Sequence, residues 1–135
     1  MGRVIFVDTS FWVALIARRD DRHDVAVPLL RRYGTEPLIT SSHVRGETWT
    51  FLGRRYGHSP AVSFLDTLDR TTRIHVEFVD QDVEAQAIGW FRRHDERKYS
   101  FVDATSVTLM RSLRIRRALA FDGGFEAAGF EELRA

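Results

Sequence analysis

Residues 4–15 read VIFVDTSFWVAL, and this stretch indicates how the chain folds. Its first four residues are apolar, which is typical of a short strand buried on both faces. Thr9 or Ser10 can cap the apolar helix that is predicted to follow. Asp8 is therefore expected where a buried strand becomes a helix. Considered alone, this carboxylate is either a local helix cap or one wall of an active site.

The remainder of the chain alternates short apolar segments with amphipathic ones. Strands are predicted at 37–41, at 73–80, at the start of 117–125 before a glycine-rich turn, and within 130–134. Helices are predicted at 24–33, 41–57, 59–70, 81–95 and 99–113. This alternation implies an α/β sandwich around a mostly parallel sheet. In such sheets ligands bind beyond the carboxyl ends of the strands, where Asp8 and Asp122 are expected.

Three helix ends carry local signals. Gly57 is predicted to stop one helix in a left-handed conformation. Ser59 and Pro60 then read as the cap and the first-turn proline of the next helix. Ser100 and Asp103 have the spacing of a capping box.

Length and composition limit the class of protein. At 135 residues, the chain is expected to form one domain, residues 1–135. It has no cysteine, which excludes a disulfide scaffold and a thiolate metal site. Its longest wholly apolar run, 11–17, is far shorter than the roughly 20 residues that span a bilayer, and the N-terminus lacks a signal-peptide pattern. A cytoplasmic protein with no membrane partner is therefore expected.

The formal net charge of +1 conceals a preference for arginine, because Lys98 is the only lysine among 20 basic residues. Arginine binds phosphate in a bidentate manner. An arginine-rich genome and solvated helix faces explain the same composition, so the basic clusters indicate nucleic acid only weakly. The basic residues near the acidic segments of the chain are the candidates for contact with a nucleic-acid backbone, namely Arg45, Arg54, Arg55, Lys98 and Arg111. Surface salt bridging is the more frequent role for such residues.

Four acidic residues lie within apolar segments rather than polar loops, namely Asp8, Glu47, Asp103 and Asp122. Burying an unpaired carboxylate costs several kcal/mol, so each needs a local partner or they share one. Asp103 has a local explanation in the capping box, and Asp122 has one as a turn former before two glycines. Glu47 has the weakest local explanation, since no basic residue lies four positions away.

A shared partner would be a hard cation. The five histidines show no zinc spacing, and there is no glycine-rich phosphate loop. Clustered carboxylates without soft ligands suit Mg²⁺ or Mn²⁺, whose matching chemistry is phosphodiester hydrolysis. An aspartyl-phosphate phosphatase fits poorly. That chemistry requires a second carboxylate two residues after the nucleophile and a lysine near the phosphate, but Ser10 lies two residues after Asp8 and Lys98 is the only lysine.

Four segments of the chain resemble one family: VIFVDTSFWVAL, HVRGETW, YSFVDATSVTLM and ALAFDGGFEAAGFEEL. They are similar to PIN-domain ribonucleases, specifically to the VapC-type toxins of bacterial toxin–antitoxin pairs. The resemblance covers residues 4–133. The order and spacing of the acids also match, with Glu47 39 residues after Asp8, Asp103 56 later and Asp122 19 later.

The resemblance implies a single PIN domain with a three-layer α/β/α fold and a central, mostly parallel sheet of four or five strands. It places one or two Mg²⁺ or Mn²⁺ ions among the four acids. Asp8 and Asp103 would be the principal ligands, while Glu47 and Asp122 would bind directly or through water. Ser10 matches a small hydroxyl residue that supports the site, although a helix N-cap explains it equally well.

The resemblance also implies an endoribonuclease toxin that forms a homodimer and is covered by the C-terminal segment of a VapB-type antitoxin, often with an arginine against the carboxylates. The implied substrate is structured RNA, with the sarcin–ricin loop of large-subunit ribosomal RNA favoured over transfer RNA. A non-toxin PIN nuclease of RNA processing and a non-catalytic RNA-binding PIN domain remain alternatives. Trp12 and Trp49 are candidates for binding the antitoxin segment, but core packing is the favoured interpretation of both.

Overall fold

Five parallel strands form the central sheet of the computed structural model, which describes residues 3–134. Their order is β3-β2-β1-β4-β5, and each neighbouring pair is parallel. The strands are β1 (Ile5–Val7), β2 (Leu38–Ser41), β3 (Ile74–Glu77), β4 (Arg117–Leu119) and β5 (Glu131–Glu132). The apolar run of β1 is fully buried because both of its edges are paired and both of its faces are covered.

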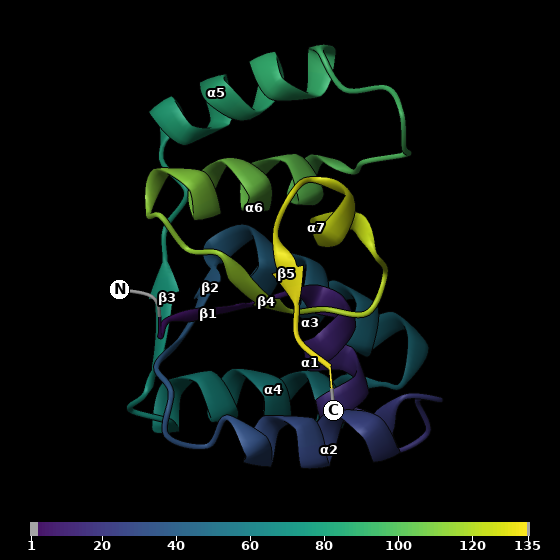
Figure 1. The fold of residues 1–135 in the computed structure, drawn as a ribbon. Coiled ribbons are helices and arrows are strands. Elements are labelled where there is room, and N and C mark those ends of the chain that lie inside the picture. The colour runs from purple at the N-terminus through teal and green to yellow at the C-terminus, as the bar shows by residue number, and fades with distance from the viewer. Residues whose placement is uncertain (1–2, 135) are drawn as a thin grey trace.

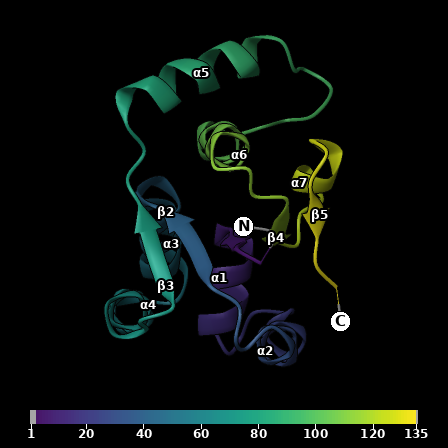
Figure 2. The same ribbon diagram turned by 60° about the vertical axis from the view of Figure 1, so that its left-hand side comes forward.

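Helices cover both faces of this sheet (Figures 1 and 2). On one face lie α1 (Thr9–Ile16), α2 (His23–Arg32), α3 (Ser42–Arg55) and α4 (His58–Arg70). On the other lie α5 (Gln81–Arg92), α6 (Phe101–Ser112) and the short α7 (Gly124–Ala127). The predicted three-layer α/β/α sandwich with a parallel sheet is therefore confirmed, with five strands. No helix among residues 3–134 is long and apolar enough to cross a membrane.

Trp12 joins the first helix to the sheet. Its indole packs edge-on against Phe64 of α4, with ring centroids 5.5 Å apart. The indole N–H donates to the hydroxyl of Thr40 in β2 at 3.2 Å, and that hydroxyl donates to the carbonyl of Val7 at 2.9 Å. Core packing of Trp12 is thus confirmed. Trp49 differs, since 54% of its surface is exposed on α3, and the expectation that it packs in the core was wrong.

The order of the strands reverses direction at β1. From β1 the chain crosses to β2 and then β3 on one side, and it later returns to place β4 on the other side. The amide of Asp8 donates to the carbonyl of Leu119 at 3.0 Å, so the ends of β1 and β4 are held side by side. Ligands of open parallel sheets bind at such a reversal, beyond the carboxyl ends of the strands.

Two predicted boundaries were wrong for reasons of capping. The strand predicted at 73–80 ends at Glu77, and Asp80 instead caps α5 by accepting from the amide of Val83 at 2.9 Å. Helix α4 starts at His58 rather than after a Ser59 cap. Its N-cap is Gly57, with φ of +107°, so the residue predicted to stop one helix also starts the next.

Gly57→Ala should lower the free energy of unfolding by about 1–3 kcal/mol, because the positive φ of this residue with an extended ψ is a conformation that only glycine adopts readily. Chemical denaturation measures the loss. Gly53→Ala is the matched control, since Gly53 lies inside α3 in open space and alanine there should stabilise the helix by up to about 1 kcal/mol. Equal effects of the two variants would contradict the conformational argument.

Candidate active site

Asp8 lies directly after β1 and is the N-cap of α1. One of its carboxylate oxygens, Oδ2, accepts from the amide of Ser10 at 3.3 Å and from the Ser10 hydroxyl at 3.0 Å. The prediction that Thr9 or Ser10 caps this helix was therefore wrong, because the extended backbone at Asp8 already aims its side chain at the free amides of the first turn. The same carboxylate also lines a cavity, so its role as a helix cap does not remove it from a place where a ligand could bind.

Ser10 connects two distant parts of the chain. Its hydroxyl donates to Asp8, and the same oxygen accepts from the backbone amide of Phe121 at 3.0 Å. Phe121 immediately precedes Asp122 in the loop that follows β4. The Ser10 side chain thus holds the end of β1 against the loop that carries Asp122.

Glu47 lies half-buried on α3, beside the buried stripe formed by Val44, Thr48 and Leu52. The hydroxyl of Thr9 donates to its Oε1 at 2.6 Å. From the sequence, Thr9 was a candidate only for a helix cap. In the structure it is the hydrogen-bond partner of Glu47, for which no partner could be found nearby in the sequence. Only tertiary packing of α1 against α3 reveals this contact.

Asp103 and Asp122 each have the local role that the sequence allowed. The capping box is present, with the Ser100 amide donating to Asp103 Oδ2 at 2.9 Å and the Asp103 amide donating to the Ser100 hydroxyl at 3.0 Å. The amide of Gly124 donates to Asp122 Oδ1 at 2.9 Å in the predicted turn. These roles orient the two carboxylates without removing them from the site.

All four predicted acids line one cavity of about 390 Å³ at the carboxyl end of the sheet. None of them forms an ion pair with a lysine, arginine or histidine among residues 3–134. Burial raises the pKa of Asp8 from 3.8 to about 7, and the negative charges of Asp122 and Asp103 add to this. Burial is also the main cause that raises the pKa of Glu47 and of Asp103, each with a contribution from neighbouring carboxylates.

The carboxylate oxygens that line this cavity are of the type that binds a hard cation. In each of the four carboxylates, one oxygen accepts a hydrogen bond from a group within residues 3–134. The second oxygen accepts no hydrogen bond from these residues. The donor set is all oxygen, and its charges repel one another. In the present arrangement, no three acidic or histidine side chains of the described part of the chain are grouped closely enough to hold an ion by themselves.

Two arginines beside the cavity were missed by sequence reasoning. Arg22 lines the cavity, donates to the carbonyl of Phe121 at 3.2 Å and lies over its ring at 5.1 Å. Arg97 donates to the carbonyl of Asp122 at 3.0 Å, and its charge opposes the rise in the pKa of Asp103. In the sequence, both arginines simply lie in polar segments. They reach the site only through tertiary contacts with the loop after β4, which the sequence does not show.

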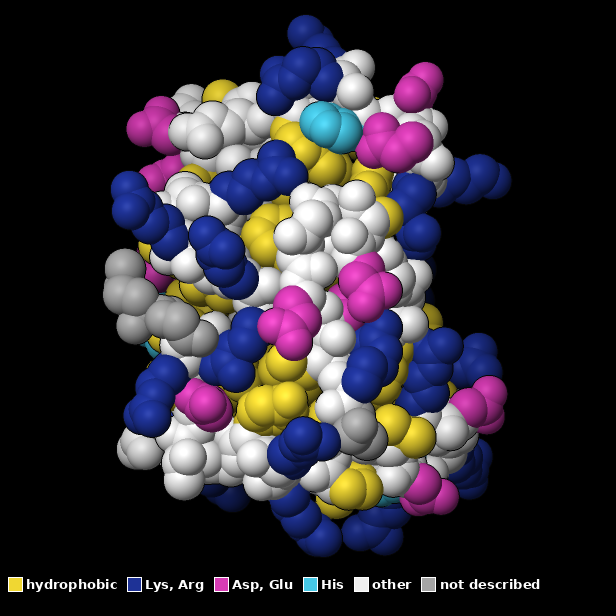
Figure 3. Space-filling model, viewed as in Figure 1, with side chains coloured by type: hydrophobic (Ala, Val, Ile, Leu, Met, Phe, Trp, Pro, Cys, Tyr) yellow, Lys and Arg dark blue, Asp and Glu magenta, His cyan; other side chains and the backbone are white. Residues whose placement is uncertain are grey.

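The five predicted RNA-contact residues are not brought together. Arg54 and Arg55 line a groove next to Glu47. Arg45 lies over the ring of Phe78 at 5.2 Å, and Arg111 donates to a backbone carbonyl at the C-terminal end of α7 at 2.9 Å. Lys98 is exposed in the segment before α6. On the face seen in Figure 3, lysine and arginine side chains are dispersed among acidic ones rather than gathered in one patch.

Glu132, at the end of β5, is a buried carboxylate that the sequence did not single out. It accepts from the amides of Gly123, Phe125 and Glu126 at 3.1 to 3.3 Å and from the guanidinium of Arg134 at 3.1 Å. Three of these donors belong to the turn directly after Asp122. Glu132 therefore fixes the loop that carries the fourth acid.

Comparisons with known proteins agree on one family. The family model described as PIN domain matches residues 5–131. Two curated relatives from Mycobacterium tuberculosis strains CDC 1551 / Oshkosh and H37Rv, both named 23S rRNA-specific endonuclease VapC20, are 52% identical over 133 residues, covering 97% of this chain and 98% of theirs. A VapC ribonuclease of Archaeoglobus fulgidus is 25% identical over 125 residues, or 88% of this chain and 77% of its own.

One solved structure has the same fold throughout. A crystal structure of Mycobacterium tuberculosis VapC20, described as a sarcin–ricin loop cleaving toxin, superposes with a TM-score of 0.90 at 51% sequence identity. The match covers 97% of this chain and 99% of that chain.

The raised pKa of Asp8 predicts that, without divalent cations, stability falls as the pH rises. Between pH 3.8 and about 7, the folded protein retains a proton on Asp8 that the unfolded chain has lost, so the free energy of unfolding decreases through this window. Thermal unfolding in EDTA at several pH values measures the trend. Asp8→Asn should be more stable than wild type near neutral pH and should show a shallower decrease, the remainder belonging to Glu47 and Asp103. An equally steep decrease in the variant would contradict this origin.

Glu132→Ala should lower the free energy of unfolding by about 2 kcal/mol or more, because it leaves three backbone amides and a guanidinium without their acceptor. Urea denaturation at neutral pH measures this loss. Glu131→Ala changes the exposed neighbour in the same strand and should stay within about 0.5 kcal/mol of wild type. If the two variants were equally stable, Glu132 would not anchor the loop.

Proposed function

Since the chain belongs to the PIN-domain family, we propose that it is a VapC-type toxin, an endoribonuclease that cleaves the sarcin–ricin loop of 23S ribosomal RNA. The observation that carries the proposal is the meeting of four carboxylates, without a cationic partner among the described residues, at the carboxyl end of the sheet. The target is supported by the names of relatives that match almost the whole chain at 51–52% identity.

We propose that Asp8 and Asp103 are the principal ligands of one or two Mg²⁺ or Mn²⁺ ions, with Glu47 and Asp122 binding directly or through water. When bound, the ions would supply an acidified water molecule and neutralise charge on the phosphate. The protein holds each carboxylate by one oxygen, through Thr9, Ser10, Ser100 and the amide of Gly124. These hydrogen bonds leave the second oxygen of each carboxylate to face the ions or the substrate.

Glu47 is suited to orient the attacking water. It lies on α3, on the wall of the cavity from which the groove with Arg54 and Arg55 extends. The Thr9 hydroxyl fixes one carboxylate oxygen, and the other, which accepts no hydrogen bond within residues 3–134, is left to accept one from the water. Arg54 and Arg55 are then placed to contact phosphates of the RNA beside the cleaved bond.

The same cluster of carboxylates suits an inhibitory partner. We propose a cognate VapB-type antitoxin, whose cationic segment would bind in the acidic cavity by charge complementarity. The family resemblance supports a homodimer as the functional unit. Lys98, Arg45 and Arg111 stay as candidates for RNA contact outside the cavity.

The proposed activity predicts that purified protein cuts a sarcin–ricin hairpin at one position with Mg²⁺ or Mn²⁺ and loses this activity in EDTA. Asp8→Asn and Asp103→Asn should lower the cleavage rate by about 100-fold or more, while circular dichroism shows an intact fold. The expected loss is large because changing even a residue that only supports a metal ligand commonly lowers activity by about 10–100-fold. Asp82→Asn, on the exposed first turn of α5, is the control and should cleave like wild type.

Sequencing the 5′ ends of cellular RNA after brief expression identifies the target directly. Ends that map to the sarcin–ricin loop support the proposal, and ends that map to transfer RNA overturn the target while keeping the nuclease. If wild type produced no new ends and Asp8→Asn were as toxic as wild type, the proposed function would be wrong.

A further inference from the structure

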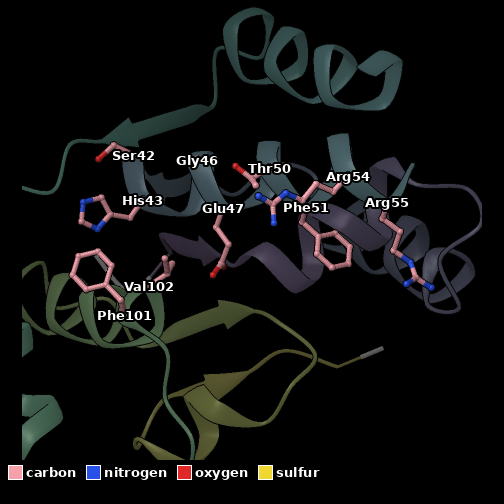
Figure 4. A pocket seen from close by; sticks show the side chains of 10 residues that line it. All are labelled: Ser42, His43, Gly46, Glu47, Thr50, Phe51, Arg54, Arg55, Phe101 and Val102. Carbon is pink, nitrogen blue, oxygen red and sulfur yellow. The ribbon is translucent and has the colours of Figure 1, made fainter. Parts of the chain in front are cut away.

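A groove runs along α3 and opens into the acidic cavity. One wall is α3 and the other is the N-terminal end of α6, and we call it the α3–α6 groove (Figure 4). Glu47 and Phe51 line both the groove and the cavity. In Figure 4, Glu47 points into the middle of the groove, with Phe51 and Arg55 toward one end and His43 and Phe101 toward the other.

Two phenylalanine rings in this groove are exposed to solvent. Phe51 is 43% exposed and Phe101 is 53% exposed, although both are large apolar side chains. Apolar surface left open beside a polar site commonly marks a binding surface. The rings lie on either side of a proposed catalytic carboxylate, so a ligand that reaches Glu47 passes one or both of them.

The Phe101 ring is held in place before any ligand binds. It lies against the imidazole of His43, with ring centroids 5.1 Å apart and planes inclined by 32°. His43 is positioned in turn by Thr105, whose hydroxyl lies 3.3 Å from Nδ1, and by Glu84, whose carboxylate lies 3.7 Å from Nε2. A fixed ring loses little conformational freedom on binding, which favours its use as a stacking platform.

The other end of the groove carries positive charge. Arg54 and Arg55 line it, and neither forms an ion pair with a carboxylate of the described residues. Arginine side chains contact nucleic-acid phosphates, whereas exposed aromatic rings stack on bases that have left a helix. Both kinds of group therefore occur in one groove that leads to the acids.

We infer that the α3–α6 groove binds an unstacked nucleobase next to the cleaved phosphate, with Phe51 and Phe101 as its stacking surfaces. This inference rests on the proposed function and specifies how its substrate is read. An RNA loop fits better than a protein segment, because the groove is continuous with the acidic cavity and combines exposed rings with two arginines that form no ion pair within residues 3–134. A base-paired stem does not fit, since its bases are stacked on one another.

The test measures RNA binding separately from cleavage. In an Asp8→Asn background with EDTA, a sarcin–ricin hairpin labelled with fluorescein is titrated by anisotropy. Phe51→Ala and Phe101→Ala should each weaken binding by about 10-fold, a typical effect of removing one base-stacking ring. Phe51→Tyr should restore the affinity, because tyrosine keeps the ring. Phe91→Ala is the matched control, as this phenylalanine is equally exposed at 49% on α5 but does not line the groove.

A second pair of variants excludes loss of stability as the cause. Gly46 lines the groove and has open space around its Cα, so Gly46→Leu fills the groove while favouring the helix. It should raise the melting temperature and still weaken hairpin binding by about 10-fold or more. Gly89→Leu, at a half-buried position of α5 where an added Cβ makes only an ordinary contact with the Arg93 side chain, is the same change outside the groove and should leave binding unaltered.

A cleavage assay with the wild-type protein separates failure of the proposed function from failure of the proposed base-binding groove. If wild type does not cut the hairpin, the proposed function and the inference both fail. If it cuts the hairpin while the phenylalanine and Gly46 variants bind RNA normally, the inference alone is overturned. It is also overturned if sedimentation shows that these variants lose the oligomeric state of wild type, because the groove would then belong to an interface between copies of the chain.

Discussion

A hydrogen bond network around the Ser10 hydroxyl is the contact on which the site depends. The Ser10 hydroxyl bonds both Asp8, at the end of β1, and the amide of Phe121, which lies 111 residues after Ser10 in the chain. Because β1 and β4 are neighbours where the strand order reverses, their following segments diverge and leave a cavity between them. Ser10 sets the separation of these segments and thereby the relation of Asp8 to Asp122.

The acidic cavity is a place where folding and function oppose each other. Burial and mutual repulsion raise the pKa of three of its carboxylates, so their charged forms are disfavoured in the folded chain. A protein selected only for stability would place apolar or paired residues there. None of the four acids forms an ion pair within residues 3–134, so the cavity suits the positively charged ligands proposed above, a divalent cation and the cationic segment of an inhibitor.

Stability for this arrangement is supplied by groups around the site. Trp12 and Thr40 fix α1 on the sheet, and Thr9 on that helix in turn holds Glu47. Glu132 anchors the turn after Asp122, and the capping box orients Asp103. Each acid is thus held by a donor from a helix end or turn, which keeps the four carboxylates oriented despite their mutual repulsion.

The sequence by itself determined the alternation of strands and helices and hence a layered α/β fold, because hydrophobic periodicity and capping signals act over a few residues. Acids in apolar segments, together with the family resemblance, also singled out the four carboxylates that the structure brings to one cavity. Even the local roles of Asp103 and Asp122 were readable from their neighbours in the chain. Asp8 was misjudged only in assigning its capping role to Thr9 or Ser10. The tertiary structure alone decided that Thr9 meets Glu47, that Ser10 reaches Phe121, that Arg22 and Arg97 border the cavity, and that Trp49 is exposed. The hydrogen bonds among these join residues that are 25 to 111 positions apart, and the exposure of Trp49 depends on which face of α3 its neighbours cover. Both are determined by how the elements pack, which a local sequence pattern does not contain.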